Sequence, residues 1–285
     1  MKVLVTGAHG QLGRDILRVM EEESPERHHV IGMGRHDLDI KAGQQVMTRF
    51  EEERPEIVIH AAAYTQVDQA ESELDQAYAV NALGTRNVAV AAEKVGAKLI
   101  YISTDYVFDG CNKTPYTEFD AVNPQSVYGK SKRAGEEFVL ALSRQHFIVR
   151  TSWVYGEYGA NFVKTMLKLG KSGKPIQVVN DQMGSPTYTV DLARFLKNLM
   201  QTELYGIYHA TNAGSCTWYE FACAIFEESG MEVELSPCTT QAFPRPAPRP
   251  AYSVLDHMGI RLSGLEDLRP WREALKAFLH FSVNI

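Results

Sequence analysis

Tyr128 and Lys132 are the two residues whose types and spacing most clearly suggest chemistry in this chain of 285 residues. They lie near the start of an apolar pattern over residues 126–143 that predicts a helix. Four residues apart on one helix face, their Cβ atoms are expected about 5–6 Å from each other. A phenol has an ordinary pKa near ~10, and a neighbouring ammonium favours its ionised form. The pair therefore predicts an acid–base site, although the same spacing arises by chance in many helices.

A hydroxyl side chain is the third expected member of this site. Residues 98–103 form an apolar run that predicts a buried strand, and Thr104 follows the run directly. Thr104 could there hydrogen-bond both a substrate carbonyl oxygen and the phenol, and so support charge that develops on oxygen. Ser103 is the alternative, because side chains alternate along a strand and only one of the two faces the cleft.

Three glycines near the N-terminus, Gly7, Gly10 and Gly13, form the second candidate site. They follow a predicted strand over residues 3–6 and open a predicted helix. Without side chains, they allow a tight turn and a close approach of phosphate oxygens to backbone amides at the helix N-terminus. In this context the spacing predicts a dinucleotide-binding turn rather than a purely structural one.

The choice of cofactor depends on the end of the second predicted strand. An acid is expected there for the ribose 2′-hydroxyl of NAD, but Arg35 stands there instead and suits a 2′-phosphate. The sequence therefore favours NADPH, with NADH tolerated, unless Arg35 is only a solvated surface charge. Ala61, Ala62 and Ala63 close the third predicted strand, and their small side chains would let the cofactor lie across the strand ends.

The elements that must position these residues alternate between strand and helix patterns. Continuous apolar strands between amphipathic helices are typical of a parallel sheet covered on both faces. The predicted fold class is α/β, a doubly wound parallel sheet of Rossmann type with a small interleaved α/β lobe. The predicted strands are residues 3–6, 29–33, 57–60, 98–103 and 147–150, and the predicted helices are residues 11–23, 44–53, 75–94 and 126–143.

The pattern of predicted elements changes after about residue 153, where the strands become shorter. We expect residues 1–153 to form mainly the nucleotide-binding domain, and residues 154–285 mainly a substrate-binding lobe with segments returning to the sheet. The proline-rich residues 243–251 can be neither helix nor central strand. The predicted helices of this half are residues 161–169, 190–200, 218–228 and 272–281, and its predicted strands are residues 176–179, 207–210 and 232–235.

Composition excludes several classes of protein. The net charge of −6 argues against nucleic-acid binding, and no apolar run reaches the length of a membrane span. The four cysteines are scattered without metal-ligand spacing, as in a protein with reduced thiols. We therefore expect a cytoplasmic protein that binds neither nucleic acid nor membrane.

A family resemblance emerges when the longer motifs are taken together. The glycine turn, the hydroxyl after the fourth strand and the Tyr–Lys pair look like the extended short-chain dehydrogenases/reductases. More narrowly, the chain resembles the dTDP-4-dehydrorhamnose reductases over nearly its whole length. The segments that carry this resemblance are residues 61–68 (AAAYTQVD), 103–110 (STDYVFDG), 180–187 (NDQMGSPT) and 249–256 (RPAYSVLD).

The resemblance implies a role for each candidate residue. Tyr128 would be the proton donor, Lys132 its electrostatic partner and a contact of the cofactor ribose, and Thr104 the hydroxyl that tunes it. Thr104, Asp105 and Trp153 would touch the sugar, although Trp153 fits core packing equally well. The implied cofactor contacts are Gly10, Gln11, Leu12, Asp39, Ile40, Ala61, Ala62 and Ala63. From charge alone, Arg249 and Arg245 are candidates for the substrate diphosphate, or ordinary loop residues.

The implied activity is reduction of the 4-keto group of dTDP-4-dehydro-6-deoxy-L-mannose to dTDP-L-rhamnose with NAD(P)H. An epimerase or epimerase-reductase is the alternative enzyme, but no placed Cys/His pair supports it. A non-catalytic regulatory subunit also resembles this family, and the intact Tyr–Lys–Thr set disfavours it. Some family members dimerise through Mg²⁺ held by glutamates after the glycine turn. This chain has Asp15 there, so no metal is predicted and a homodimer stays open.

Overall fold

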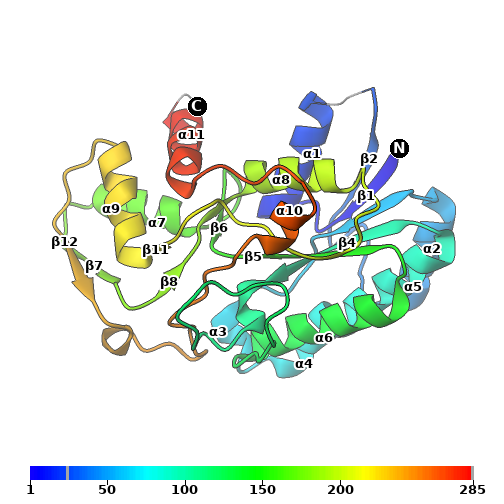
Figure 1. The fold of residues 1–285 in the computed structure, drawn as a ribbon, viewed down its shortest axis with the longest axis horizontal. Coiled ribbons are helices and arrows are strands. Elements are labelled where there is room, and N and C mark those ends of the chain that lie inside the picture. Colours follow the sequence, from blue (N-terminus) through cyan, green and yellow to red (C-terminus); the bar gives the residue numbers. More distant parts are fainter. Residues whose placement is uncertain (24–25, 284–285) are drawn as a thin grey trace.

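The central feature of the computed structural model is a six-stranded sheet between two layers of helices (Figure 1). The model describes residues 1–23 and 26–283. All neighbouring strands of this sheet are parallel, in the order β10-β5-β4-β3-β1-β2. The predicted doubly wound α/β fold is confirmed. The strands are β1 (Lys2–Thr6), β2 (His29–Met33), β3 (Ile57–His60), β4 (Lys98–Thr104), β5 (His146–Thr151) and β10 (Gly206–His209).

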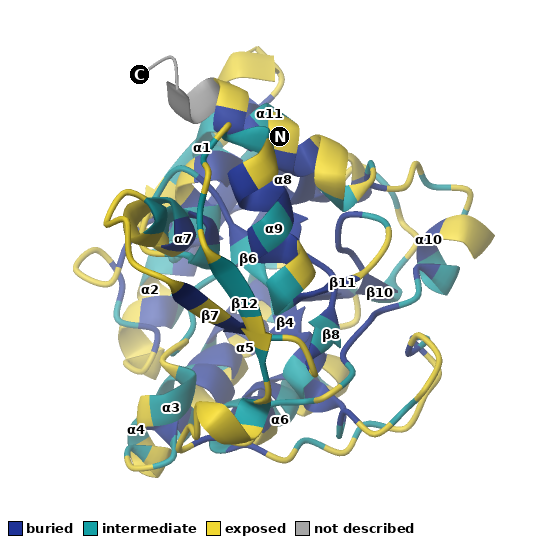
Figure 2. Ribbon diagram, turned by 90° about the vertical axis from the view of Figure 1, so that its left-hand side faces the viewer, coloured by how far each residue is buried: buried dark blue, intermediate teal, exposed yellow. Residues whose placement is uncertain are grey.

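The inner strands β1, β3, β4 and β5 are buried on both faces because their alternate residues enter two separate cores. Val3 and Val5 of β1 belong to one core, and Leu4 between them belongs to the other. The same alternation divides Ile100 from Tyr101 on β4. Figure 2 shows the resulting dark interior beneath a partly exposed layer of helices. This alternation explains why the strands are continuous apolar runs in the sequence.

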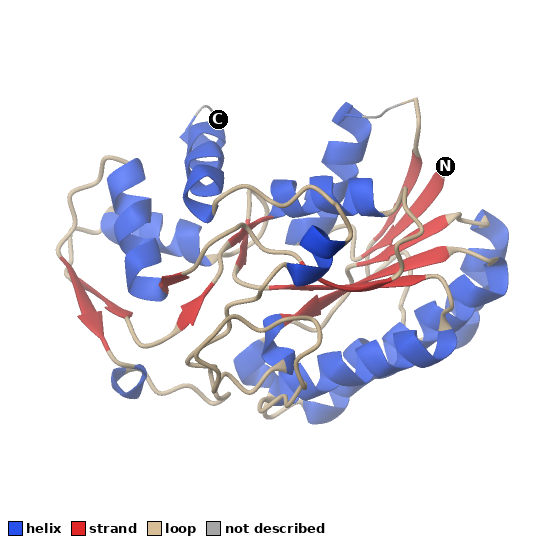
Figure 3. Cartoon of the chain, viewed as in Figure 1, coloured by secondary structure: helices blue, strands red, loops and turns tan. Residues whose placement is uncertain are grey.

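Helices cover the two faces in separate groups. On one face α1 (Gln11–Glu23) packs against α8 (Thr189–Leu199), and both contribute to the core that holds Val3. On the other face lie α2 (Gly43–Glu53), α5 (Thr85–Val95) and α6 (Val127–Leu142), as Figure 3 shows below the sheet. The chain leaves β1 for β2 at one side and then crosses to β3 at the other, so the switch point of the sheet lies between β1 and β3.

The helix predicted over residues 75–94 is present, but a π-helical segment interrupts its α-helical hydrogen bonding. After the short α3 (Val67–Ala70), the chain forms α4 (Leu74–Tyr78), a π-helix (Ala79–Gly84) and then α5 without a break. In the π-helix the buried Asn81 side chain accepts a hydrogen bond from the backbone N–H of Tyr64 (2.8 Å) and donates to Ser131 Oγ (2.9 Å). The wide turn brings this amide to the loop after β3 and to α6. Helical periodicity alone cannot reveal such a bulge, because tertiary hydrogen bonds stabilise it.

The second half of the chain builds a smaller lobe from short paired strands, seen at the left of Figure 1. The predicted strand at 232–235 is displaced to β12, because its parallel pairing with β7 starts at Leu235 opposite Ile176. Segments also return to the sheet, since β10 pairs with β5. The division of the chain at residue 153 stays a prediction. The remaining elements of the second half are β6 (Val154–Tyr155), α7 (Phe162–Gly170), β7 (Ile176–Val179), β8 (Met183–Gly184), β9 (Thr187–Tyr188), β11 (Cys216–Thr217), α9 (Trp218–Glu228), β12 (Leu235–Cys238), α10 (Met258–Leu262) and α11 (Trp271–Val283).

A buried ion pair joins α6 to β5. Glu136 of α6 is fully buried, and its two carboxylate oxygens accept hydrogen bonds from Arg150 Nε (2.8 Å) and Nη2 (2.9 Å). Ser103 at the end of β4 donates to the same carboxylate (2.6 Å). This bidentate geometry satisfies both charges and ties the helix to two adjacent strands. Arg133 adds a third cationic contact to Glu136 (2.9 Å).

Arg150→Met is expected to lower the free energy of unfolding by about 3–5 kcal/mol, because it leaves the Glu136 charge buried without its main partner. Urea denaturation at neutral pH measures the change. The matched control is Arg144→Met, which removes an ion pair with Glu93 in which the arginine side chain is 90% exposed. That control should change stability little, because solvent screens the pair. Equal stability of the two variants would contradict this account of the buried pair.

Candidate active site

A cavity of about 1230 Å³ opens at the carboxyl ends of the central strands. Its lining comes from the loops after β1, β2, β3, β4 and β5 and from the start of α6. Every predicted site residue except Arg249 and Arg245 lies on its wall. These residues are Gly7, Gly10, Gln11, Leu12, Gly13, Arg35, Asp39, Ile40, Ala61, Ala62, Ala63, Thr104, Asp105, Tyr128, Lys132 and Trp153.

The glycine turn at the cavity floor is shaped by crowding of backbone atoms. Gly7 has a φ of +69°, and a Cβ there would stand 2.6 Å from the backbone nitrogen of Ala62. A Cβ at Gly13 would stand 2.2 Å from the carbonyl oxygen of Gly7. The first turn of α1 therefore packs directly on the end of β1, at the switch point beside β3. Because Gly10, Gln11, Leu12 and Gly13 line the cavity, the N-terminal end of α1, which is the positive end of the helix dipole, faces it.

Two further glycines let α6 approach the sheet closely enough for its tyrosine and lysine to reach the cavity. A Cβ at Gly129 would stand 2.2 Å from the carbonyl oxygen of Tyr106, and one at Gly135 would stand 2.4 Å from the carbonyl oxygen of Asn81. Ser126 caps the helix by accepting a hydrogen bond from the Gly129 N–H (3.1 Å). Neither glycine is among the site residues predicted from the sequence, although Gly129 directly follows Tyr128 and Gly135 lies three residues after Lys132.

The Tyr128 phenol is protonated at neutral pH in this environment. Burial raises its pKa to about 12, while a hydrogen bond with Thr104 acts in the opposite direction and the charge of Asp105 raises it further. The expected lowering of the pKa by Lys132 is not seen. A protonated phenol is nevertheless the state that a proton donor needs. Tyr106 packs edge-on against the ring, with centroids 5.6 Å apart.

Lys132 is deeply buried, and its ammonium is held away from bulk water. Its Nζ donates to the carbonyl oxygen of Ile102 (2.7 Å) and lies 4.0 Å from the centre of the Tyr101 ring. Burial lowers the pKa of Lys132 to about 7, and the negative charge of Glu136 opposes that shift. Lys132 is thus fixed at the end of β4, and the charge that favours its ammonium form is that of Glu136, one helical turn away.

The two adjacent hydroxyls at the end of β4 have different partners, as strand alternation predicts. Ser103 lies on the same face of β4 as Tyr101, and it donates a hydrogen bond to Glu136 of α6. Thr104 instead donates to Asp105 Oδ1 (3.0 Å) and accepts from the Tyr106 N–H (3.3 Å), and it lies close enough to Tyr128 to lower the pKa of that phenol. The geometry therefore favours Thr104 as the hydroxyl beside the phenol.

Asp105 is a buried carboxyl group on the cavity wall. One oxygen, Oδ1, accepts from Thr104, whereas Oδ2 is buried without a hydrogen-bond partner in the part of the chain that the structure describes. Burial raises the pKa of Asp105 to about 6, and the neighbouring hydroxyl groups of Ser253 and Thr104 oppose the shift. An unsatisfied buried oxygen is costly, so a ligand donor placed there would be favourable.

The arginines predicted to hold phosphate lie in different places. Arg35 is exposed at the end of β2 and lines the cavity. Arg249 lies outside the cavity lining, because its guanidinium is paired with Asp68 (2.8 Å) and with the carbonyl oxygen of Ala247 (3.3 Å). The role of Arg249 toward a diphosphate stays a prediction, and it would require this ion pair to open. Arg245 is exposed in the same loop.

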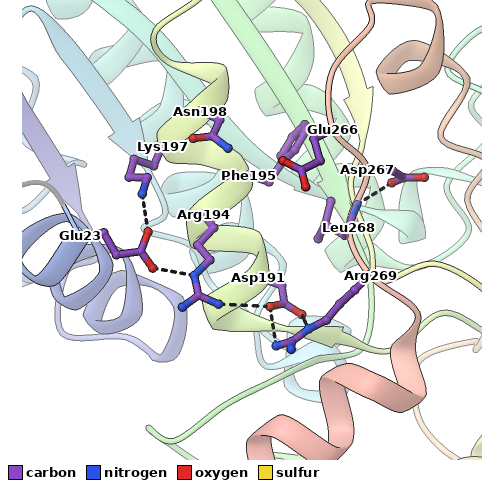
Figure 4. Close-up of a pocket in the computed structure, with 10 residues that line it drawn as sticks. All are labelled: Glu23, Asp191, Arg194, Phe195, Lys197, Asn198, Glu266, Asp267, Leu268 and Arg269. Carbon is purple, nitrogen blue, oxygen red and sulfur yellow. Dashed lines mark hydrogen bonds and ion pairs between the residues drawn. The ribbon is translucent and has the colours of Figure 1, made fainter.

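A second, smaller cavity of about 230 Å³ lies between α1, α8 and the loop before α11 (Figure 4). Its cationic groups face carboxylates. Arg269 makes a bidentate pair with Asp191 (2.7 and 2.8 Å), and Arg194 and Lys197 both bind Glu23. Because these charges compensate one another, this cavity offers little attraction to an anionic substrate.

Comparison with known proteins agrees with this arrangement. The sequence model of a protein family described as "RmlD substrate binding domain" matches residues 1–283. The chain belongs to this family. The spore coat polysaccharide biosynthesis protein SpsK of Bacillus subtilis is 47% identical over 278 residues, which cover 98% of this chain and 96% of SpsK. The predicted resemblance to dTDP-4-dehydrorhamnose reductases is confirmed by solved structures.

Two of those structures match over almost the whole chain. The dTDP-4-dehydrorhamnose reductase of Clostridium acetobutylicum has a TM-score of 0.96 and 49% identity, covering 99% of this chain and 100% of its own. The Bacillus anthracis dTDP-4-dehydrorhamnose reductase, crystallised with NADP, has a TM-score of 0.95 and 50% identity, covering 98% of this chain and 99% of its own.

Asp15 and its neighbours show whether this chain has side chains that could bind a metal ion. Asp15 of α1 is fully buried, with its oxygens bound by Arg18 (2.8 Å) and by the Thr189 hydroxyl. These contacts give Asp15 a packing role between α1 and α8. Within residues 1–23 and 26–283, no group of three or more His, Cys, Asp or Glu side chains could hold a metal ion. Over the same residues, no helix is both long and apolar enough to cross a membrane.

We expect the free energy of unfolding of Asp105→Asn to rise relative to that of the wild type as the pH rises. The raised pKa means that folded Asp105 holds its proton up to about pH 6, whereas the unfolded chain releases it near 3.8. Its stabilisation is thus complete below pH 3.8 and is lost as pH rises through 6, by about 3 kcal/mol in total. Asparagine does not titrate, so its contribution to the free energy of unfolding stays the same over this pH range. Urea denaturation of both proteins at pH 4 and pH 7.5, without added cofactor, measures the difference.

Asp109→Asn is the matched control with the opposite sign. Hydrogen bonds from the Cys111 N–H and the Tyr116 hydroxyl lower the pKa of Asp109. Its stabilisation is therefore present above its ordinary pKa and lost as pH falls. This variant should lose stability mainly at pH 7.5. If the stability of the two variants changed with pH in the same direction, burial would not be what sets the pKa of Asp105.

Proposed function

We propose that this chain reduces the 4-keto group of dTDP-4-dehydro-6-deoxy-L-mannose to dTDP-L-rhamnose, using NADPH, with Tyr128 as the proton donor. The observation that carries the proposal is a single cavity that holds a dinucleotide-type glycine turn at one part of its wall and Tyr128, Thr104 and Lys132 at another. Relatives that bear the reductase name are about half identical to this chain over its whole length. NADPH consumption by purified protein with a panel of dTDP-4-keto sugars tests it directly.

The residues around the glycine turn fit a dinucleotide. Gly7, Gly10 and Gly13 line the cavity at the start of α1, and the N–H groups of a first helical turn suit a pyrophosphate. Ala61, Ala62 and Ala63 form a low wall at the switch point, where the nicotinamide half could extend toward Tyr128. Arg35 would attract the 2′-phosphate of NADPH, and NADH would bind without that contact.

The chemistry divides between the cofactor and the protein. When bound, NADPH supplies the hydride that forms the new C–H bond at the keto carbon of the sugar. Tyr128 donates its proton to the keto oxygen, which completes the hydroxyl. Thr104 hydrogen-bonds the phenol and so stabilises the phenolate that remains. Lys132 would hold the cofactor ribose and balance the new negative charge.

The sugar would occupy the part of the cavity between Asp105 and Trp153. Asp105 lines this part of the cavity, and its carboxyl group would accept a hydrogen bond from a sugar hydroxyl. The Trp153 indole offers an apolar face to the sugar ring. Cytoplasmic location and a homodimer stay predictions from the sequence.

Tyr128→Phe removes the proposed proton donor while keeping the shape of the ring. We expect kcat to fall by about 10²–10⁴-fold with little change in NADPH affinity. Steady-state NADPH oxidation and a fluorescence titration of NADPH measure the two effects. Lys132→Met should lower kcat/KM further, because it also removes the predicted cofactor contact. Near-full turnover of the dTDP-4-keto sugar by Tyr128→Phe would place the acid elsewhere.

Arg35→Asp tests the preference for NADPH. The new carboxylate would repel a 2′-phosphate and could accept a hydrogen bond from a ribose 2′-hydroxyl. KM for NADPH should therefore rise, while KM for NADH stays the same or falls. Arg27→Asp, at an exposed arginine outside the cavity lining, controls for the change in net charge. If Arg35→Asp and Arg27→Asp give the same ratio of the two KM values, Arg35 is only a surface charge.

A further inference from the structure

We propose that Trp218 is a positioning residue that holds the Trp153 indole as a fixed wall at the sugar end of the cavity. The inference rests on the proposed function only in assigning that end of the cavity to the sugar. Trp218 begins α9 in the smaller lobe, whereas Trp153 lies between β5 and β6. The two residues are far apart in the chain, and the tertiary structure brings their rings into contact.

The backbone of Trp153 is held in an unfavourable conformation. Its φ is +47°, in the left-handed region that bulky residues rarely adopt. Such a conformation persists only where the surroundings determine it. Its carbonyl oxygen accepts a hydrogen bond from the Thr187 N–H of β9 (3.2 Å), which fixes the backbone but leaves the side chain to other contacts.

Two contacts determine where the indole of Trp153 lies. The Trp218 ring stacks on it, with centroids 3.5 Å apart and planes 8° from parallel. Gly184 of β8 makes room for its edge, since a Cβ there would stand 2.6 Å from Trp153 Cε2. The indole is therefore in contact with both a facing ring and a backbone that carries no side chain. This packing also explains one glycine within the NDQMGSPT segment.

Trp218 is itself well anchored. Thr217 caps α9 by accepting a hydrogen bond from the Glu220 N–H (3.1 Å), and the Glu220 carboxylate accepts a hydrogen bond from the Thr217 N–H (2.7 Å). Thr217 also donates to Asn180 Oδ1 (2.6 Å). The Phe162 ring packs against Trp218, with centroids 4.6 Å apart. The first turn of α9 is thus a rigid support rather than a loop contact.

Trp218 acts through Trp153 because only one of the two rings reaches the cavity. Trp153 belongs to the cavity wall, and Trp218 is not among the described residues that line it. Both residues are half-buried. Removal of Trp218 would leave the Trp153 indole unsupported on its stacked face, so the wall could move while the proton donor and glycine turn stay in place.

The kinetic test uses Trp218→Leu. We expect KM for the dTDP-4-keto sugar to rise about tenfold, the size of effect that one aromatic contact provides. KM for NADPH and kcat should change little, because neither site is touched. Trp218→Phe should restore most of the sugar affinity by returning a stacking ring. Trp271→Leu is the matched control, since Trp271 meets Phe221 in the same lobe and should leave KM for the sugar unchanged.

A double-mutant cycle separates positioning from a general effect on the lobe. If Trp218 acts only through Trp153, adding Trp218→Leu to Trp153→Ala should raise KM for the sugar no further. A further rise in that background would overturn the proposal, as would an unchanged KM in Trp218→Leu alone. Gly184→Ala should raise KM through the same indole and give no additive effect with Trp218→Leu.

A fluorescence readout keeps this test independent of the assigned activity. The chain has three tryptophans, so Trp218→Leu/Trp271→Phe leaves Trp153 alone. Acrylamide should quench the fluorescence of Trp153 in that variant more strongly than it quenches the tryptophan fluorescence of the wild type. Trp271→Phe alone should show no such increase in quenching. Unchanged quenching would overturn the positioning role. Increased quenching in a protein that reduces no dTDP-4-keto sugar would instead contradict the proposed function and leave the support of Trp153 in place.

Discussion

The geometry of the cavity depends on the buried attachment of α6 to the ends of β4 and β5. Glu136 holds Arg150 from one strand and Ser103 from the other, all shielded from water. Lys132, one turn earlier on the helix, donates to the Ile102 carbonyl at the end of β4. Because these contacts fix both the axial position and the rotation of the helix, Tyr128 can only face the strand ends. Gly129 and Gly135 are needed for the same close approach.

A second constraint joins this catalytic edge to the nucleotide edge. The Asn81 side chain binds the backbone of Tyr64, which follows the three alanines after β3, and also contacts Ser131 of α6. The loop after β3 is thus held between the glycine turn on one side and α6 on the other. The distance between a dinucleotide and the phenol is thereby set by rigid elements rather than by mobile side chains.

Burial dominates the electrostatics of the site, and it acts on each group according to the sign of its charge. It raises the pKa of Tyr128 to about 12 and that of Asp105 to about 6, and it lowers that of Lys132 to about 7. In each case burial stabilises the neutral form of the side chain relative to the charged form, because desolvation penalises charge. A neutral phenol suits proton donation to a ketone. The charge that Lys132 and an oxidised nicotinamide bring would favour the phenolate afterwards.

The sequence by itself determined the parallel sheet, the glycine turn and the Tyr–Lys pair, because each depends on local rules. Strand runs buried on both faces, glycines that follow a strand, and a four-residue helical spacing are all visible within short windows. Only the tertiary structure decided which of Ser103 and Thr104 stands beside the phenol, because the answer depends on the partner that Glu136 provides. The same holds for the π-helix at Asn81, the stacking of Trp218 on Trp153 and the pairing of Arg249 with Asp68. Each of these features depends on a contact between segments distant in the chain, which local patterns do not encode.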